Sequence, residues 1–288
     1  MRARAHAKIN LSLRVLGTRA DGYHELRTIF QSIALHDTLT IRRARGPFRL
    51  TCDDPTCPAD DANLISKAAA RLWTASGRRG LPRDVVVDLR KRIPMQAGLG
   101  GGSSDAASAL LALGRLWRVD EANVRAVGAA IGADVPYFFE GGTVLGLERG
   151  DRLFPLLDRP RAWVVLALPA FGVSTKEAFG WFDERRPSRS SRRALLGGVE
   201  APAGVVESAN DLEGPVAAHH PEIGRIISAL RRSGASQAAM SGSGSAVFGL
   251  FPERTAALRA ARRLEMRSRR VVVTRTLTRA QYRALAPI

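Results

Sequence analysis

The sequence predicts an α+β protein made of two halves, and three features predict it. Apolar and polar residues alternate with a strand-like period in the first 50 residues, for example in KINLSLRV. Helically spaced apolar residues follow in the same half. After residue 160 the expected order is strand, helix, strand, strand, helix, strand, which is typical of a ferredoxin-like half. A chain of 288 residues has room for two ordinary domains, which we place at 1–155 and 156–288.

The first half begins with strands and continues with helices. Four stretches have strand character: 4–17, 19–35 with an Asp-Gly turn near its start, 37–44 and 47–52. We predict that the last two pair in an antiparallel manner. Asn63 and Gly77 suit the two ends of a helix, as N-cap and C-cap. The half continues with a strand over 84–94, helices over 105–117 and 121–132, and a short loop over 133–142.

The second half alternates strands and amphipathic helices. A buried strand is expected over 162–168, and the segment from Pro187 to Pro202, rich in Arg, Ser and Gly, is expected to be mobile. The remaining predicted elements are a helix over 221–234, two strands joined by a Gly-Ser turn over 235–251, a helix over 253–268 and a strand over 269–277.

Composition bounds the class of protein. Lysine and arginine outnumber the acids 44 to 27, which gives a net charge of +17. A basic surface attracts polyanions, so a nucleic-acid-binding module is one alternative. The arginine clusters are nearly free of aromatic residues, so no platform for stacking bases is visible. We therefore interpret the clusters as solvated faces and expect no nucleic-acid partner.

The sequence also indicates the compartment of the protein and the redox state of its cysteines. The stretch 162–173 is the most apolar, but it is too short to span a bilayer and contains Pro169. Residues 1–17 lack the apolar core of a secretory signal. We expect a cytoplasmic protein without membrane contact, in which Cys52 and Cys57 are free thiols.

The loop before residue 105 has the composition of an anion site. A strand is expected before it and a helix after it, and the first N–H groups of a helix have no partner within the helix. The N-terminus of a helix therefore favours negative charge. The glycines let a phosphate approach the backbone, and the serines add hydroxyl groups for phosphate oxygens or a magnesium ion. These residues are Gly98, Gly100, Gly101, Gly102, Ser103 and Ser104. The alternative is a plain flexible turn.

The loop departs from two common phosphate-binding patterns and resembles a third. It lacks the Gly-Lys-Ser/Thr ending of a Walker A loop, and position 103 is serine where the dinucleotide fingerprint has glycine. Its string Pro-x-x-x-Gly-Leu-Gly, followed by small residues, Ser-Ser and Ala-Ala, resembles the phosphate loop of the GHMP kinases, which include galactokinase, homoserine kinase and mevalonate kinase. The residues that carry the resemblance are Pro94, Gly98, Leu99, Gly100, Gly101, Gly102, Ser103, Ser104, Asp105, Ala106 and Ala107.

Three further blocks support the resemblance in the order of the family. They are AKINLSLRVLGTRADGYHEL (7–26), GADVPYFFEGG (132–142) and MSGSGSAVFGLF (240–251). With the triple glycine, they are most similar to the branch that uses ATP to phosphorylate the 2-hydroxyl of 4-diphosphocytidyl-2-C-methyl-D-erythritol in non-mevalonate isoprenoid synthesis. The resemblance implies a first half like domain 2 of ribosomal protein S5 and a ferredoxin-like second half. The alternatives within the family are homoserine and mevalonate kinases, against which Tyr23-His24 and the triple glycine argue.

The resemblance implies roles for individual residues. Asp134 would be the base that accepts the hydroxyl proton, with a turn or capping role as the alternative. Lys8 would reach Asp134 and the transferring phosphate. Asn10 lies two residues further along the expected strand, so it faces the same side as Lys8. The implied substrate contacts are Asn10, Tyr23, which would stack on cytosine, His24, which would hydrogen-bond it, Thr175 and Phe179.

The resemblance also implies an ATP side. The backbone from Gly98 to Ser104 would hold the phosphates. The implied residues of the adenine pocket are Asn63, Leu64, Lys91 and Met95; the first two have capping and core roles as alternatives. The sequence shows no acidic metal cage, so Mg²⁺ is expected to arrive with ATP, held partly by phosphate and water. Both a monomer and a homodimer are compatible with the sequence.

Overall fold

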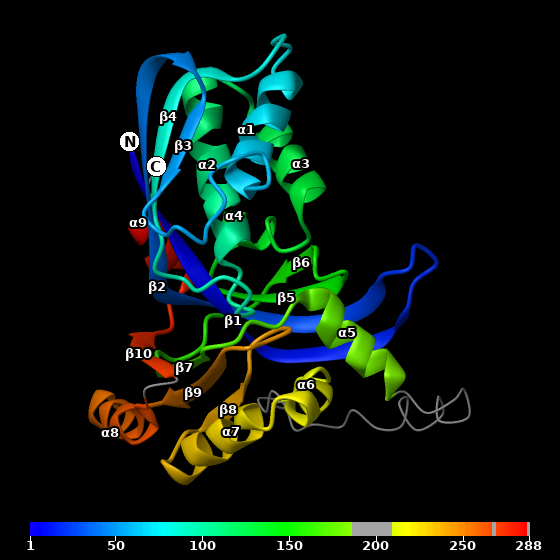
Figure 1. The fold of residues 1–288 in the computed structure, drawn as a ribbon, viewed down its shortest axis with the longest axis vertical. Coiled ribbons are helices and arrows are strands. Elements are labelled where there is room, and N and C mark those ends of the chain that lie inside the picture. The colour runs from blue at the N-terminus through cyan, green and yellow to red at the C-terminus, as the bar shows by residue number, and fades with distance from the viewer. Residues whose placement is uncertain (186–208, 267–268, 287–288) are drawn as a thin grey trace.

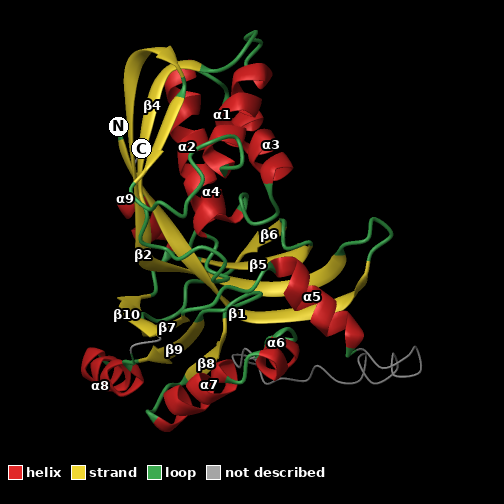
Figure 2. Ribbon diagram, in the orientation of Figure 1, coloured by secondary structure: helices red, strands yellow, loops and turns green. Residues whose placement is uncertain are grey.

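The computed structural model of this chain describes residues 1–185, 209–266 and 269–286. Its elements form two β-sheets with helices packed against them, which confirms the α+β class (Figures 1 and 2). The first sheet has the strand order β3-β4-β2-β5-β6, with β1 paired to β2. Its strands are β1 (Arg2–Thr18), β2 (His24–Pro47), β3 (Arg49–Cys52), β4 (Arg83–Arg90), β5 (Thr143–Glu148) and β6 (Arg152–Pro155).

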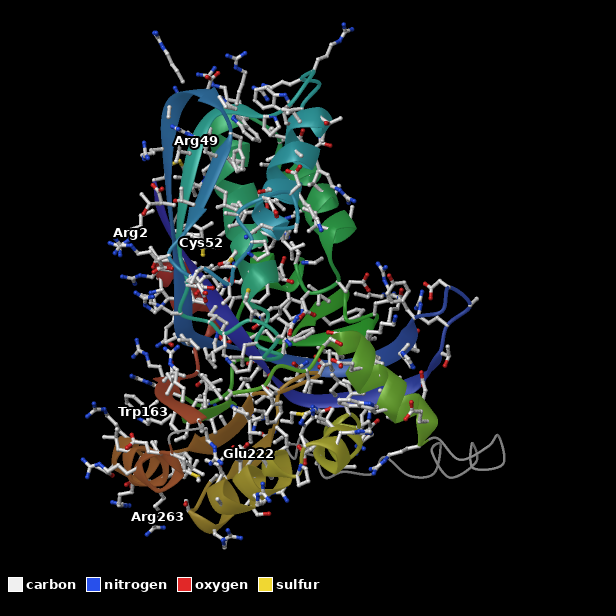
Figure 3. The ribbon with its side chains drawn as sticks, in the orientation of Figure 1. Arg2, Arg49, Cys52, Trp163, Glu222 and Arg263 are labelled. Atoms are coloured by element: carbon white, nitrogen blue, oxygen red, sulfur yellow. The ribbon has the colours of Figure 1, made fainter. Side chains whose placement is uncertain are left out.

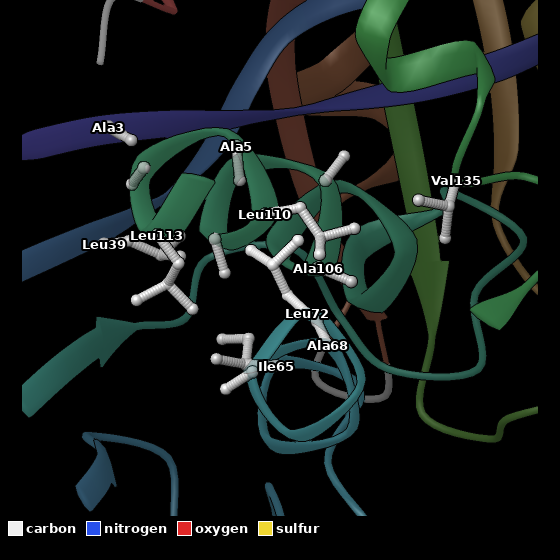
Figure 4. Packing of buried hydrophobic residues seen from close by; sticks show 14 of the residues in the cluster. Ala3, Ala5, Leu39, Ile65, Ala68, Leu72, Ala106, Leu110, Leu113 and Val135 are labelled. Carbon is white, nitrogen blue, oxygen red and sulfur yellow. The ribbon is translucent and has the colours of Figure 1, made fainter. Parts of the chain in front are cut away.

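Helices cover one side of the first sheet and enclose its core. They are α1 (Leu64–Ala75), α2 (Gly101–Trp117), α3 (Glu121–Ile131) and the single turn α4 (Tyr137–Glu140). Figure 4 shows Leu72 of α1 and Leu110 of α2 directed toward each other, with Ala106 nearby. Alanine is frequent on the buried face of α2, and its small side chain lets the helix approach β1 closely. This packing fixes the start of α2 beside β1.

The second sheet has the strand order β10-β7-β9-β8, and all its pairs are antiparallel. Its strands are β7 (Trp163–Pro169), β8 (Gln237–Met240), β9 (Val247–Phe251) and β10 (Arg269–Arg275). The helices of this half are α5 (Thr175–Glu184), α6 (Glu213–His219), α7 (Glu222–Arg232), α8 (Arg254–Leu264) and α9 (Arg279–Leu285). With β7 as first strand, the order in space is fourth, first, third, second, so the predicted ferredoxin-like half is confirmed.

A third hydrophobic cluster joins the two sheets. It places Ile9 and Leu11 of β1 against Leu166 of β7 and Phe248 of β9. The predicted division at residues 155 and 156 stays a prediction, because α9 returns to the first half. There Tyr282 Oη donates to the carbonyl of Phe138.

One predicted pairing is wrong. The segment 47–52 does not pair with 37–44: its strand, β3, runs parallel to β4, with Leu50 opposite Val87. The reason is that β4 lies antiparallel along this part of β2, with Leu39 opposite Leu89. That edge of β2 is therefore filled, and β3 adds to the outer side of β4.

Two helix boundaries also differ from the prediction. Helix α2 begins at Gly101, four residues before the predicted start at 105, so that much of the glycine loop is the first turn of a helix. The predicted loop 133–142 contains α4. Asn63 caps α1 as predicted, because its side chain accepts a hydrogen bond from Ile65 N. The C-cap of α1 is Ser76, with Gly77 one residue later at a φ of 76°.

The remaining expectations concern surface and thiols. Arg2, Arg49 and Arg263 are exposed at the periphery of the fold (Figure 3). Cys52 and Cys57 are free thiols as predicted, and burial with the neighbouring Cys52 raises the pKa of Cys57 to about 12. No helix in the described parts of the chain has the length and apolar composition needed to cross a membrane. The segment from Pro187 to Pro202 lies outside the described residues.

His6 is a buried histidine at the junction of β1 and α9. Its ring lies 5.1 Å from that of His36 and 5.6 Å from that of Tyr282, measured between centroids. Burial, with repulsion from His36 and Arg4, lowers the pKa of His6 from 6.5 to about 4. The unfolded chain therefore binds a proton here at a higher pH than the folded chain. His6 contributes stability above pH 6.5, and this contribution is lost as the pH falls from 6.5 toward 4.

Comparison with a His6→Leu variant tests this assignment. Between pH 7.5 and pH 5, the wild-type free energy of unfolding should fall by about 2 kcal/mol more than that of the variant. Urea unfolding followed by circular dichroism at both pH values measures the difference, and the other titrating groups cancel in it. Equal pH dependence in the two proteins would show that His6 is not the group responsible.

Candidate active site

The glycine loop connects β4 to α2 and is folded against protein neighbours. Gly98 and Gly100 both have a φ of 70°, which favours glycine. A Cβ at Gly98 would lie 2.0 Å from the backbone oxygen of Ser241, and one at Gly100 would lie 2.7 Å from Cζ of Phe138. These two positions therefore need glycine because of the protein itself, before any ligand is considered.

The first turn of α2 presents its backbone N–H groups at the end of this loop. The first intrahelical bond runs from Ser104 N to the carbonyl of Gly100, so the N–H groups of Gly101 to Ser103 have no carbonyl within the helix. The first turn contains no acidic residue. The Ser104 hydroxyl is buried and donates to the carbonyl of His6, whereas Ser103 is half-buried. The geometry suits an anion, with Ser103 as the accessible hydroxyl.

Lys8 and Asp134 meet beside this turn. Lys8 Nζ lies 3.5 Å from Asp134 Oδ2, and the lysine side chain is 4% exposed while the aspartate is 35% exposed. The Lys8 ammonium also donates to Asn10 Oδ1 at 2.6 Å, and Asn10 Nδ2 donates to Thr28 Oγ1 at 2.7 Å. Lys8 N donates to the carbonyl of Leu99, which ties β1 to the loop. A buried cation thus faces a carboxylate that solvent can reach.

The turn between β8 and β9 completes the site. Ser241 Oγ donates to the carbonyl of Gly98 at 2.9 Å and accepts from Asn10 N at 3.3 Å. Gly242 packs beside the Lys8 ammonium, since a Cβ there would lie 3.3 Å from Nζ. Segments near residues 8, 98, 134 and 241 therefore converge, from both halves of the molecule.

A buried ion cluster lies beneath the start of α2. Lys91 Nζ donates to Asp37 Oδ2 and to Asp105 Oδ2, the latter at 2.8 Å, and Asp37 also accepts from Ile93 N at 2.8 Å. Burial raises the pKa of Asp105 to about 8, with Asp37 adding to the shift and Lys91 opposing it. Burial disfavours the Lys91 ammonium, but the two carboxylates outweigh it and hold the pKa of Lys91 above its usual value.

The predicted adenine residues have different surroundings in the structure. Lys91 is committed to the ion cluster. The Asn63 side chain caps α1 and donates to the carbonyl of Pro58 at 2.6 Å. Leu64 borders the helix start, because a Cβ at Gly102 would lie 3.6 Å from its Cδ1. Met95, next to Pro94, is exposed.

The predicted substrate residues gather where the β1–β2 turn meets α5. The rings of His24 and Phe179 stack with centroids 4.5 Å apart, and His24 Nε2 lies 2.9 Å from Asp183 Oδ1. Tyr23 is exposed, with the Arg149 guanidinium 5.5 Å from its ring centroid. Thr175, at the start of α5, lies 3.4 Å from Ser243 between hydroxyl oxygens. Phe179 therefore contacts His24 in this structure.

Sequence reasoning missed several residues that support the site. Thr28, Asp37, Phe138 and Asp183 were not singled out, and Asp105 was named only as part of the phosphate-loop motif, without its place in the ion cluster. Their contacts come mostly from distant segments, such as Phe138 beneath Gly100. For Asp183 a signal existed: it lies four residues after Phe179, on the same face of an expected helix.

The described part of the chain offers little side-chain ligation for a metal ion. No group of three or more His, Cys, Asp or Glu side chains there is arranged to hold a metal ion. Ser103 offers a hydroxyl in the first turn of α2, and Asp134 offers a carboxylate beside Lys8. A Mg²⁺ ion bound to phosphate oxygens and water fits such sparse protein ligation.

Comparison with known proteins shows similarity to one kinase family. Residues 63–142 match the family profile described as GHMP kinases N terminal domain, and residues 201–267 match the one described as GHMP kinases C terminal. The 4-diphosphocytidyl-2-C-methyl-D-erythritol kinase of Moorella thermoacetica is 42% identical over 95% of this chain and 98% of that protein. The enzyme of the same name from Solibacter usitatus is 41% identical over 98% and 90%.

Solved structures agree. A crystal structure of 4-(cytidine 5'-diphospho)-2C-methyl-D-erythritol kinase superposes with a TM-score of 0.77 at 36% identity, over 96% of this chain and 99% of that chain. The homoserine kinase of Cytophaga hutchinsonii superposes with a TM-score of 0.72 at 18% identity, over 96% and 94%. The second likeness concerns the fold alone.

Proposed function

The chain belongs to the 4-diphosphocytidyl-2-C-methyl-D-erythritol kinases of the GHMP kinase family, and from this premise we propose how its site works. The α+β two-domain fold and the kinase activity of that family are thereby confirmed for this chain. The proposed reaction transfers the γ-phosphoryl group of ATP to the 2-hydroxyl of 4-diphosphocytidyl-2-C-methyl-D-erythritol. The main observation that supports the proposal is the ion pair between Lys8 and Asp134 beside the glycine loop.

Asp134 is proposed as the base for the substrate hydroxyl. Its carboxylate is partly open to solvent, so an alcohol can reach it, and it sits in a turn fixed by the following Pro136. A base must lie within hydrogen-bond reach of the proton that it takes. The buried Lys8 ammonium keeps a positive charge beside the carboxylate and beside the incoming phosphoryl group.

The start of α2 is proposed to hold the phosphates of ATP. The N–H groups of Gly101 to Ser103 and the positive end of the helix dipole favour the anion. Mg²⁺, when bound, would neutralise charge on the phosphate oxygens. The ion pair between Lys91 and Asp105 would hold the start of α2 in place. Leu64 and Met95 would lie beside the bound nucleotide. In phosphoryl transfer such positioning and charge stabilisation account for most of catalysis.

The cytidine end is proposed to lie at Tyr23, His24 and α5. Tyr23 offers an exposed aromatic face, and His24 offers a ring edge. Asn10 would contact the substrate close to the reacting hydroxyl, because its side chain already binds the Lys8 ammonium. Thr175 connects this end to the β8–β9 turn through Ser243.

An ADP-release assay with three alcohols tests the proposal. We expect turnover with 4-diphosphocytidyl-2-C-methyl-D-erythritol and only background hydrolysis with mevalonate, with homoserine or without alcohol. Mass spectrometry of the product should show one added phosphoryl group. Turnover with mevalonate or homoserine, together with none on the cytidyl substrate, would overturn the proposed substrate and leave the family intact.

A further inference from the structure

Two residues on one face of α5 contact the imidazole of His24, one at the plane of the ring and one at its edge. The ring of Phe179 stacks on that of His24 at 4.5 Å with an interplanar angle of 19°, and Asp183 Oδ1 lies 2.9 Å from Nε2. Phe179 and Asp183 are four residues apart on α5, so they project from the same side of the helix. The orientation of the imidazole is therefore set by a single helix.

Contacts at its start and along its length anchor α5. Ser174 and Glu177 form a capping box at its start. Trp181 stacks on His219 of α6 at 4.2 Å and 13°. At about 1.5 Å per residue, the ten residues of α5 extend about 15 Å. Its first residue, Thr175, lies against Ser243, and Phe179 and Asp183 further along the helix contact His24. The helix can thus follow an extended substrate from its reacting end to its base.

The Asp183 contact decides which ring nitrogen of His24 carries the proton. An ionised carboxylate only accepts hydrogen bonds, so Nε2 must be the donor. In the neutral ring Nδ1 then keeps its lone pair and is an acceptor. Within the described part of the chain, Nδ1 has no hydrogen-bond partner and is not among the buried unpartnered atoms. It is accessible to a ligand.

We propose that Asp183 is a positioning residue that fixes the Nε2–H tautomer of His24 and thereby selects a cytosine over a uracil at this site. Cytosine carries a 4-amino group, which donates to the Nδ1 lone pair. Uracil carries a 4-oxo group, which would face that lone pair as a second acceptor and leave both unpaired. This inference rests on the proposed function, because it takes His24 as the residue that meets the base.

Kinetics with a cytidyl and a uridyl substrate test the selectivity. At pH 8, wild type should have a higher kcat/KM for the cytidyl ester than for its uridyl analogue. In Asp183→Ala the proton can move to Nδ1. The ratio of kcat/KM for the cytidyl ester to that for the uridyl analogue should therefore fall by about ten- to a hundred-fold, and the change should lie in the KM values for these two substrates. The KM for ATP and the kcat at saturation should stay unchanged. The neighbouring exposed Glu184→Ala removes the same charge from α5 and should leave the ratio as in wild type.

Nitrogen NMR tests the tautomer without turnover. Two-bond ¹H–¹⁵N correlations, assigned with a His24→Gln variant, should show Nε2–H in wild type and a shift toward Nδ1–H in Asp183→Ala. Titration with CDP and UDP should show the same selectivity as the kinetics. An Nδ1–H ring in wild type, or an unchanged cytidyl-to-uridyl ratio in Asp183→Ala, overturns the inference. If wild type does not phosphorylate the cytidyl ester, the proposed function fails, while the NMR result still decides the tautomer.

Discussion

Replacing Asp134 with asparagine is expected to lower kcat by about 10²–10⁴-fold, the usual contribution of a positioned base. The amide has nearly the same shape but cannot take the proton of the substrate hydroxyl. Lys8 Nζ would still find an oxygen at about the 3.5 Å of the native pair, so the phosphate side of the site keeps its charge. Steady-state kinetics with the cytidyl substrate and MgATP measure the effect, and product formation should be confirmed by mass.

Two measurements separate lost chemistry from lost structure in that variant. Its melting temperature and its affinity for MgATP should match those of wild type, because Asp134 is not part of a hydrophobic core. Glu121→Gln on the neighbouring α3 serves as a matched control, since it removes an exposed carboxylate whose ion pair in the described part of the chain is with Arg125. A kcat for Asp134→Asn within about threefold of wild type would remove Asp134 as the base.

Local patterns predicted much of the fold and part of the site. The period of a strand placed Lys8 and Asn10 on one face, and the structure joins their side chains by a hydrogen bond. The strand, loop and helix order around residue 100 predicted an anion site from backbone physics alone. The ferredoxin-like order followed from the succession of strands and helices. Each of these depends on residues close in sequence.

What sequence reasoning missed depends on distant neighbours. Glycine is a poor helix former, so the helix was expected to begin after the glycines. Tertiary packing overrides that preference: Gly101 is buried, and a Cβ there would lie 2.9 Å from Cγ2 of Ile93. The partner of β3 was likewise decided by a distant strand, β4, whose Val87 lies opposite Leu50. The ion cluster of Lys91 was also not foreseen, because its two carboxylate partners lie at positions 37 and 105; the assignment of Lys91 to the adenine pocket, which came from the resemblance, stays a prediction.

The glycines of the loop illustrate the same limit. The glycine-rich composition predicted that another group packs closely against the loop backbone, and a bound phosphate was the expected group. At Gly98 and Gly100 the close neighbours in the structure are Ser241 and Phe138. Glycine at position 98 lets the loop pack against Ser241 of the second half, and glycine at position 100 lets it pack against Phe138 of α4 in the first half. The exposed Gly102 is the position at which a ligand has open access.

Gly98→Ala is therefore expected to damage fold and nucleotide binding together. The new Cβ would lie 2.0 Å from the Ser241 carbonyl oxygen, and the φ of 70° strains any L side chain. Relief requires moving the loop away from Ser241, which breaks the hydrogen bond from Ser241 Oγ to the carbonyl of Gly98. We expect a loss of about 2–5 kcal/mol in the free energy of unfolding and at least about a tenfold rise in the KM for ATP.

Gly102→Ala is the matched control within the same loop. Its Cβ would meet only Leu64 Cδ1, at 3.6 Å, and its φ is not in the left-handed region. Alanine also favours a helix over glycine, so the melting temperature should stay level or rise. Scanning calorimetry of both variants, with the KM for ATP measured beside it, makes the comparison. If Gly98→Ala melts like wild type, the loop does not depend on its contact with Ser241. If both variants lose stability equally, stability depends on the flexibility of the whole loop. The contact between Gly98 and Ser241 is then not the reason that position 98 needs glycine.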